Sequence, residues 1–95
     1  MNLTPEELTE IEKFGELFLE PSEIAIIIGK DEQDFTDEIK DKDTAAYKAY
    51  WKGFLKSKAL VRDSIVKSAQ RDSSPAQTLL NQTIIKLERK LKLNE

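Results

Sequence analysis

The stretch that decides the expected fold is PSEIAIIIG, residues 21–29, which is followed at once by the acidic stretch DEQDFTDEI, residues 31–39. Ser22 is a good N-cap for a short helix, because its side-chain oxygen can accept a hydrogen bond from the first turn. Ala25 is small enough for two helices to cross, and Gly29 follows four residues later, where a turn needs a positive φ. This spacing predicts a helix-turn-helix.

The charge of the second helix in this stretch conflicts with reading DNA. Residues 31–43 hold seven Asp or Glu against two Lys. A helix that enters the major groove lies between phosphates and normally carries Lys or Arg. Residues 44–71 have the opposite sign, with seven Lys or Arg against one Asp. Two interpretations follow: the acidic front packs on the basic back, within one chain or between subunits, or the basic surface meets an anionic partner.

Caps and hydrophobic periodicity predict an all-α protein with four or five helices. Thr4, Pro5 and Glu7 form a helix start with a capping box, and apolar residues then recur at helical spacing to about residue 19. A strand competes only at residues 26–28, where three Ile residues are β-branched, and the caps favour a helix there. Further helices are expected at about 22–28, 32–40, 44–70 and 76–93.

We therefore expect two parts in the chain. Residues 1–42 form a helix-turn-helix-like head, and residues 43–95 form a long-helix antiparallel hairpin, because only a short break separates the last two helices. A chain of 95 residues buries a modest core, so association of several copies is expected, with the hairpin as the oligomerisation region.

The composition argues against catalysis. The chain has neither Cys nor His, which removes thiolate chemistry, the commonest general base and the commonest metal ligand. The acidic residues around Asp34 and Asp37 lack the EF-hand pattern, so a solvated helix face is favoured over a cation site. We expect no catalytic residue, no cofactor and no metal. Because no apolar run approaches the roughly 18 residues that span a bilayer, we expect a cytoplasmic protein with no membrane contact.

The long helix supplies most of the candidate binding residues. Aromatic residues at helical spacing are typical of a core or a subunit interface, although aromatics interleaved with lysines can also stack on bases. The candidate oligomer interface consists of Trp51, Phe54, Val61, Ile65, Leu80, Ile84, Leu87 and Leu91. The candidate DNA contacts are Lys30, Gln33, Thr36, Lys40, Lys48, Lys52, Lys56, Lys58 and Arg62.

Three stretches together resemble the small terminase subunits of tailed phages and prophages: PSEIAIIIG at 21–29, YWKG at 50–53 and IVKSAQRDSSPA at 65–76. The resemblance covers most of the chain from residue 21 onward. In that family this order of elements means a helix-turn-helix head followed by a helical hairpin that builds a ring.

The resemblance implies a non-catalytic DNA-recognition and adaptor subunit that assists viral DNA packaging in the cytoplasm of a bacterial host cell. Its implied partners are double-stranded DNA, further copies of the same chain, and a large terminase subunit that hydrolyses ATP and cuts DNA. Two other functions stay open. One is a protein-interaction module that recognises another protein through its acidic helix on a helix-turn-helix scaffold, and the other is a small transcriptional regulator.

Overall fold

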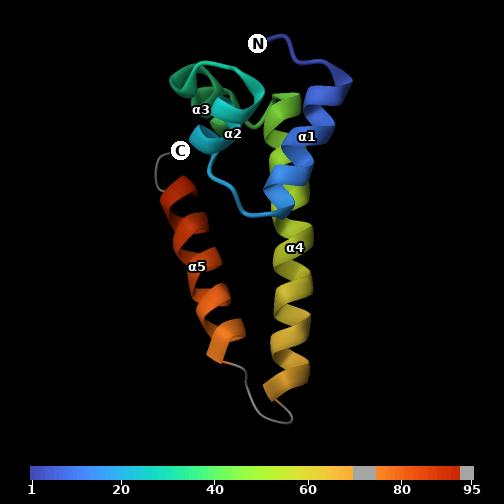
Figure 1. The fold of residues 1–95 in the computed structure, drawn as a ribbon, viewed down its shortest axis with the longest axis vertical. Coiled ribbons are helices and arrows are strands. Elements are labelled where there is room, and N and C mark those ends of the chain that lie inside the picture. The colour runs from blue at the N-terminus through green and yellow to red at the C-terminus, as the bar shows by residue number, and fades with distance from the viewer. Residues whose placement is uncertain (70–74, 93–95) are drawn as a thin grey trace. The chain divides into compact units, whose positions relative to one another are not determined.

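The computed structural model of the chain describes residues 1–69 and 75–92, which form α-helices with no β-strand among them (Figure 1). The predicted all-α class is therefore confirmed. The helices are α1 (Pro5–Glu16), α2 (Pro21–Ile28), α3 (Glu32–Lys40), α4 (Ala45–Ala69) and α5 (Pro75–Lys92). In the described residues, no helix combines the length and the apolar character that crossing a bilayer requires.

The start of α1 follows the sequence signals, whereas its end does not. The Thr4 hydroxyl accepts from the Glu7 backbone N–H at 3.1 Å, and the Glu7 carboxylate accepts from the Thr4 N–H at 3.0 Å, which completes the predicted capping box. The helix ends at Glu16 rather than near residue 19. Phe18 has a φ of 60°, so the chain leaves the helical path although the apolar spacing continues.

The start of α2 differs from the prediction. Glu20, not Ser22, occupies the N-cap, and Pro21 is the first helical residue. Pro suits this position because its fixed φ fits a helix and its missing N–H has no helical partner there. The Glu23 carboxylate accepts from the Glu20 N–H at 2.9 Å. Gly29 ends α2 with a φ of 75°, as its place in the sequence predicts.

Side-chain caps also fix the starts of α3 and α4. The Asp31 carboxylate accepts from the Asp34 N–H at 3.0 Å. At α4, the Thr44 hydroxyl accepts from the Tyr47 N–H at 3.1 Å and donates to the Glu38 carbonyl at 2.8 Å. Thr44 therefore caps α4 and also fastens the connection to the end of α3.

The chain divides into two compact units, residues 1–55 and residues 56–95. The division lies 13 residues after the expected domain boundary at 42/43. The reason is that the first part of α4 supplies core residues to the first unit: Tyr50 and Phe54 are fully buried, and the Phe54 ring meets that of Phe18 edge-on at 5.2 Å. Helix α4 thus begins in the first unit and continues into the second.

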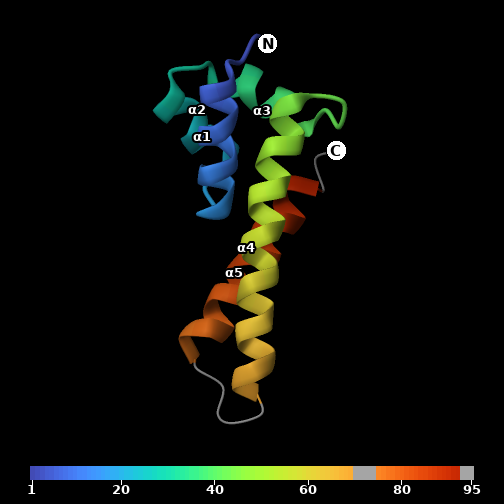
Figure 2. The same cartoon turned by 90° about the vertical axis from the view of Figure 1, so that its right-hand side faces the viewer.

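The core of the first unit joins α1, α2, α3 and the start of α4. Helices α2 and α3 pack on each other, and Figures 1 and 2 show α1 beside the first part of α4. The fully or almost fully buried apolar residues of this unit are Ile11, Ile24, Ala25, Phe35, Ile39, Ala46, Tyr50 and Phe54. Tyr50 also donates its hydroxyl hydrogen to the Leu19 carbonyl at 2.8 Å, which ties α4 to the segment after α1.

Two glycines allow α1 and α4 to touch along their backbones. A Cβ atom placed on Gly53 would lie 2.0 Å from the Glu12 carbonyl oxygen, and one on Gly15 would lie 2.5 Å from the Tyr50 carbonyl oxygen. Both distances are below the 3.0 Å that Cβ contacts respect. Gly15 and Gly53 are therefore required by the close approach of the two helices rather than by a turn.

In the second unit, α4 and α5 are linked by an ion pair between Lys58 and Glu88. These side chains are only 18% and 17% exposed. Ile84 of α5 is buried, at 1% exposure. In the sequence, Ser74 and Pro75 indicate a helix start with Ser74 as N-cap and Pro75 at the first helical position. Ser74 lies outside the described residues, and Pro75 is the first helical residue.

Candidate functional site

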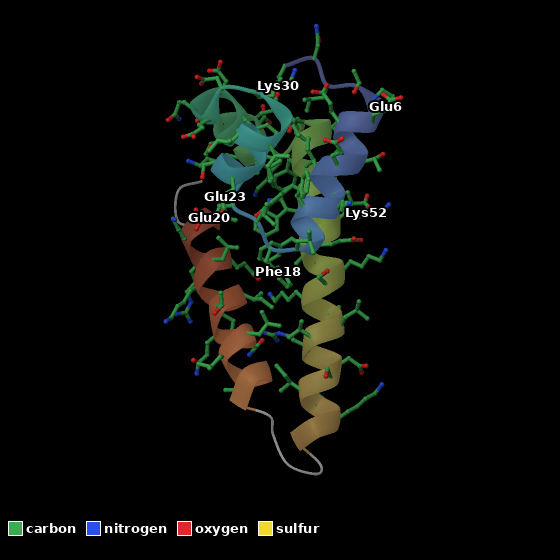
Figure 3. All side chains as sticks on the ribbon, in the orientation of Figure 1. Glu6, Phe18, Glu20, Glu23, Lys30 and Lys52 are labelled. Carbon is green, nitrogen blue, oxygen red and sulfur yellow. The ribbon has the colours of Figure 1, made fainter. Side chains whose placement is uncertain are left out.

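The exposed cations of α4 form the first candidate surface. Lys48, Lys52 and Lys56 are exposed and follow one another at intervals of four residues, so they share one side of the helix. The Lys52 ammonium group lies 3.6 Å from the Glu12 carboxylate, yet the Lys52 side chain is 71% exposed. It points away from α4 in Figure 3. Lys48 and Arg62 are exposed and form no ion pair within the described ranges. These side chains can approach the phosphates of a nucleic acid.

Lys58 does not belong to this exposed set. Its ammonium group is paired with Glu88, and both side chains are largely buried. A charge held in such a pair is desolvated and already neutralised, so it is a poor phosphate ligand. Sequence spacing alone placed Lys58 among the DNA contacts, because its partner lies 30 residues away in the chain.

Two of the four candidate polar contacts on and beside α3 are already bonded to a carboxylate. Lys30 pairs with the Glu7 carboxylate at 3.4 Å, and the Gln33 side-chain amide donates to Asp37 at 2.9 Å. Thr36 and Lys40 are half-buried. An amide that is already bonded to a carboxylate on its own helix is not free to read a base edge.

The exposed groups of α3 are predominantly acidic. Glu32, Asp34 and Asp37 are all exposed, and Asp34 and Asp37 also line a shallow depression of about 490 Å³ beside the N-terminal residue. In the described part of the chain, no three acidic, His or Cys side chains are arranged to hold a metal ion. The outer side of α3 is thus suited to a cationic partner rather than to phosphate.

One carboxylate of the first unit has an altered acidity. The backbone hydrogen bond from Thr4 is the main cause that lowers the pKa of Glu7, and the neighbouring Lys30 acts in the same direction. Burial raises the pKa of the Tyr50 hydroxyl above its usual range. The lowered pKa of Glu7 therefore follows from the helix cap, and the raised pKa of Tyr50 follows from its burial in the core, with Glu20 and Glu23 acting in the same direction.

The predicted oligomer-interface residues have several environments. Trp51 and Phe54 are 7% and 0% exposed within one chain, where their rings contact each other at 4.9 Å. Ile84 is buried, and Val61, Ile65, Leu87 and Leu91 are half-buried. Leu80 is the exposed member of the set, at 41%.

Other apolar side chains are more exposed than this predicted set. Ile26 and Ile27 of α2 are 66% and 53% exposed. In the second unit the strongly exposed large apolar residues are Leu60, Val66 and Leu79. From the sequence alone, residues 23–28 are apolar almost all round, which for so short a helix indicates burial on several sides. The useful signal was the number of Ile residues, since a helix of two turns cannot turn all of them inward.

No protein-family model, curated protein or solved structure matches this chain.

Proposed function

We propose that this chain is a non-catalytic DNA-recognition and adaptor subunit, similar to the small terminase subunits of tailed phages and prophages. In this proposal several copies assemble, hold double-stranded DNA and present it to a large packaging subunit. The proposal starts from the resemblance of residues 21–29, 50–53 and 65–76 to that family.

The local structure of the first unit supports a helix-turn-helix head. Helix α2 ends at Gly29 in the left-handed conformation, and α3 begins three residues later at Glu32. The two helices pack on each other, and Ala25 of one and Phe35 of the other are both buried. A short turn with Gly and a small residue at the crossing are features of helix-turn-helix units.

The observation that carries the DNA contact is the contrast between α3 and α4. The exposed polar groups of α3 are acidic or already bonded, whereas α4 exposes Lys48, Lys52, Lys56 and Arg62. We therefore assign the DNA contact to α4, and the contact is with phosphates. Phosphate contacts position a protein on DNA without reading its sequence. Each copy binds weakly, and the assembly gains strength because several copies bind one duplex.

The exposed apolar residues of the second unit support assembly. Leu60, Val66, Leu79 and Leu80 are between 41% and 66% exposed in the single chain. The ion pair between Lys58 and Glu88 supports a hairpin in which α4 and α5 run side by side. Apolar residues that a hairpin leaves exposed can be buried between neighbouring hairpins.

A gel-shift titration with duplex DNA at several salt concentrations tests the DNA contact. The variant K48E/K52E/K56E should not retard DNA at concentrations where the wild type does. Loss of three phosphate contacts should also lower the slope of log affinity against log salt by roughly three. The matched control is K13E/K42E/K67E, which has the same change of formal charge and should retard DNA nearly as the wild type does. Equal retardation by K48E/K52E/K56E and the wild type would refute this assignment.

A second function is favoured by the exposed acidic side of α3. Glu32, Asp34 and Asp37 are arranged to bind a basic surface of another protein. If α3 repels DNA and takes no part in contacts between copies, the variant D34N/D37N binds DNA more tightly than the wild type. If α3 instead recognises a protein, the same variant loses capture of that protein in a pull-down, and the wild type shows only weak retention of DNA at any salt concentration.

A further inference from the structure

The outer side of α2 carries two exposed apolar side chains. Five of its eight residues are Ile or Ala, of which Ile24 and Ala25 are buried. Ile26 and Ile27 point the other way and are 66% and 53% exposed. Single exposed apolar residues are common on protein surfaces. Two adjacent β-branched residues on one short helix, next to charged residues, are instead typical of a binding surface.

The charge beside this apolar pair is negative. Helix α3 packs on α2 and carries four carboxylates against Lys40, a net charge of −3 over Glu32–Lys40. Asp34 and Asp37 are exposed and lie three residues apart on α3, so they share one side of that helix. A partner for this surface therefore combines aliphatic side chains with positive charge.

Helix α5 has that combination. Leu79 and Leu80 near its start are 63% and 41% exposed. Lys86 and Arg89, further along, are exposed as well. Four cations against Glu88 give Pro75–Lys92 a net charge of +3, equal and opposite to that of α3.

We infer that the surface formed by Ile26, Ile27, Asp34 and Asp37 binds α5 of a second copy of this chain. Ile26 and Ile27 on the head and Leu79 and Leu80 on α5 are exposed, and the two surfaces are complementary in apolar character and in charge. Because each copy carries both surfaces, the contact either closes reciprocally in a dimer or repeats to generate a ring or a filament. The inference rests on the homo-oligomer of the proposed function and names the head as the place where the next subunit binds.

Charge reversal on each surface tests this contact in the full-length protein. D34K/D37K makes both surfaces basic, and K86E/R89E makes both acidic. Each variant alone should show a dissociation constant at least tenfold higher than the wild type in sedimentation equilibrium. When the two variants are mixed, the assembly should return, because every contact then joins a basic to an acidic surface. I26S/I27S should weaken assembly as well, since it removes the apolar part at exposed positions where folding does not depend on it.

The control is E10K/K13E, in which two exposed residues of α1 are reversed and assembly should not change. A wild-type assembly that survives both reversals unchanged would overturn the head contact and leave assembly through the second unit standing. A wild type that is monomeric at all concentrations would also overturn the head contact between copies. This holds even if the charge reversals show that the surface binds α5 of the same chain. An assembly that responds to the reversals as expected but does not retain DNA refutes the proposed DNA function and not this contact.

Discussion

Gly53→Ala tests the close crossing of α1 and α4. In an ordinary helix interior this change stabilises by about 1 kcal/mol, because Ala is the better helix former. Here the new Cβ would lie 2.0 Å from the Glu12 carbonyl oxygen, which is 1.0 Å inside the 3.0 Å limit. The obstacle is backbone, so no side-chain rotation relieves it. Helix α1 must withdraw by about 1 Å, and a gap of that size forfeits a quarter to a half of each contact energy across the crossing.

Overpacking of this kind costs about 1–3 kcal/mol, and a backbone obstacle places Gly53 near the upper end. After the gain in helix propensity is subtracted, we expect a net loss of about 2 kcal/mol in the free energy of unfolding. For a unit of this size that loss lowers the melting temperature by roughly 8–16 °C.

Urea unfolding followed by the fluorescence of Trp51, the single Trp of the chain, measures the effect. Trp51 lies in the first unit, with its ring 5.5 Å from that of Tyr50. The difference between Lys52→Ala and Lys52→Gly, at an exposed site on the same helix, supplies the propensity term without a clash. A Gly53→Ala protein that is as stable as the wild type, or more stable by that difference, would refute the backbone crossing.

Three further predictions concern single contacts of the first unit. Tyr50→Phe removes the hydroxyl that donates to the Leu19 carbonyl at 2.8 Å and should cost about 1 kcal/mol in urea unfolding. Thr44→Ala removes the cap of α4 and should also cost about 1 kcal/mol, whereas Thr44→Ser should retain most of it. The lowered pKa of Glu7, caused mainly by the Thr4 backbone N–H, contributes stability that is present above the ordinary value of 4.5 and is lost as pH falls through the folded-state pKa. In acid unfolding curves Glu7→Gln should therefore show a shallower pH dependence, and an unchanged dependence would contradict the assignment.

The parts of the fold that follow from neighbouring residues could be predicted from the sequence. The capping box of Thr4 and Glu7, the left-handed Gly29 and the bounds of α3 each depend on groups within a few residues of one another. All the residues that make up such a signal lie within one short stretch of chain. The N-cap of α2 shows where they become ambiguous: Ser22 is the stronger N-cap residue, yet Pro21 already fits the first helical position and moves the cap to Glu20.

Features that depend on distant partners could not be predicted. Gly53 had no local explanation, because the Glu12 backbone that excludes a side chain is far away in sequence. For the same reason, sequence spacing could not distinguish Lys58, which is paired with Glu88, from Lys56, which remains exposed. The exposure of Ile26 and Ile27 is a property of the packed unit, since periodicity identifies one buried face but not which of several Ile residues form it.

The separation of charge along the chain links the two proposals. Lys30 and Lys58 are neutralised by partners within their own units, whereas Lys48, Lys52 and Arg62 of α4 and Lys86 and Arg89 of α5 are exposed. If the acidic α3 of one copy binds α5 of the next, the cations of α5 neutralise the carboxylates that would otherwise repel phosphate. The lysines of α4 then act on DNA with less opposition than in a single copy, which adds to the gain from multivalency. In this scheme the acidity of α3 favours DNA retention by the assembly, because the same carboxylates join the subunits.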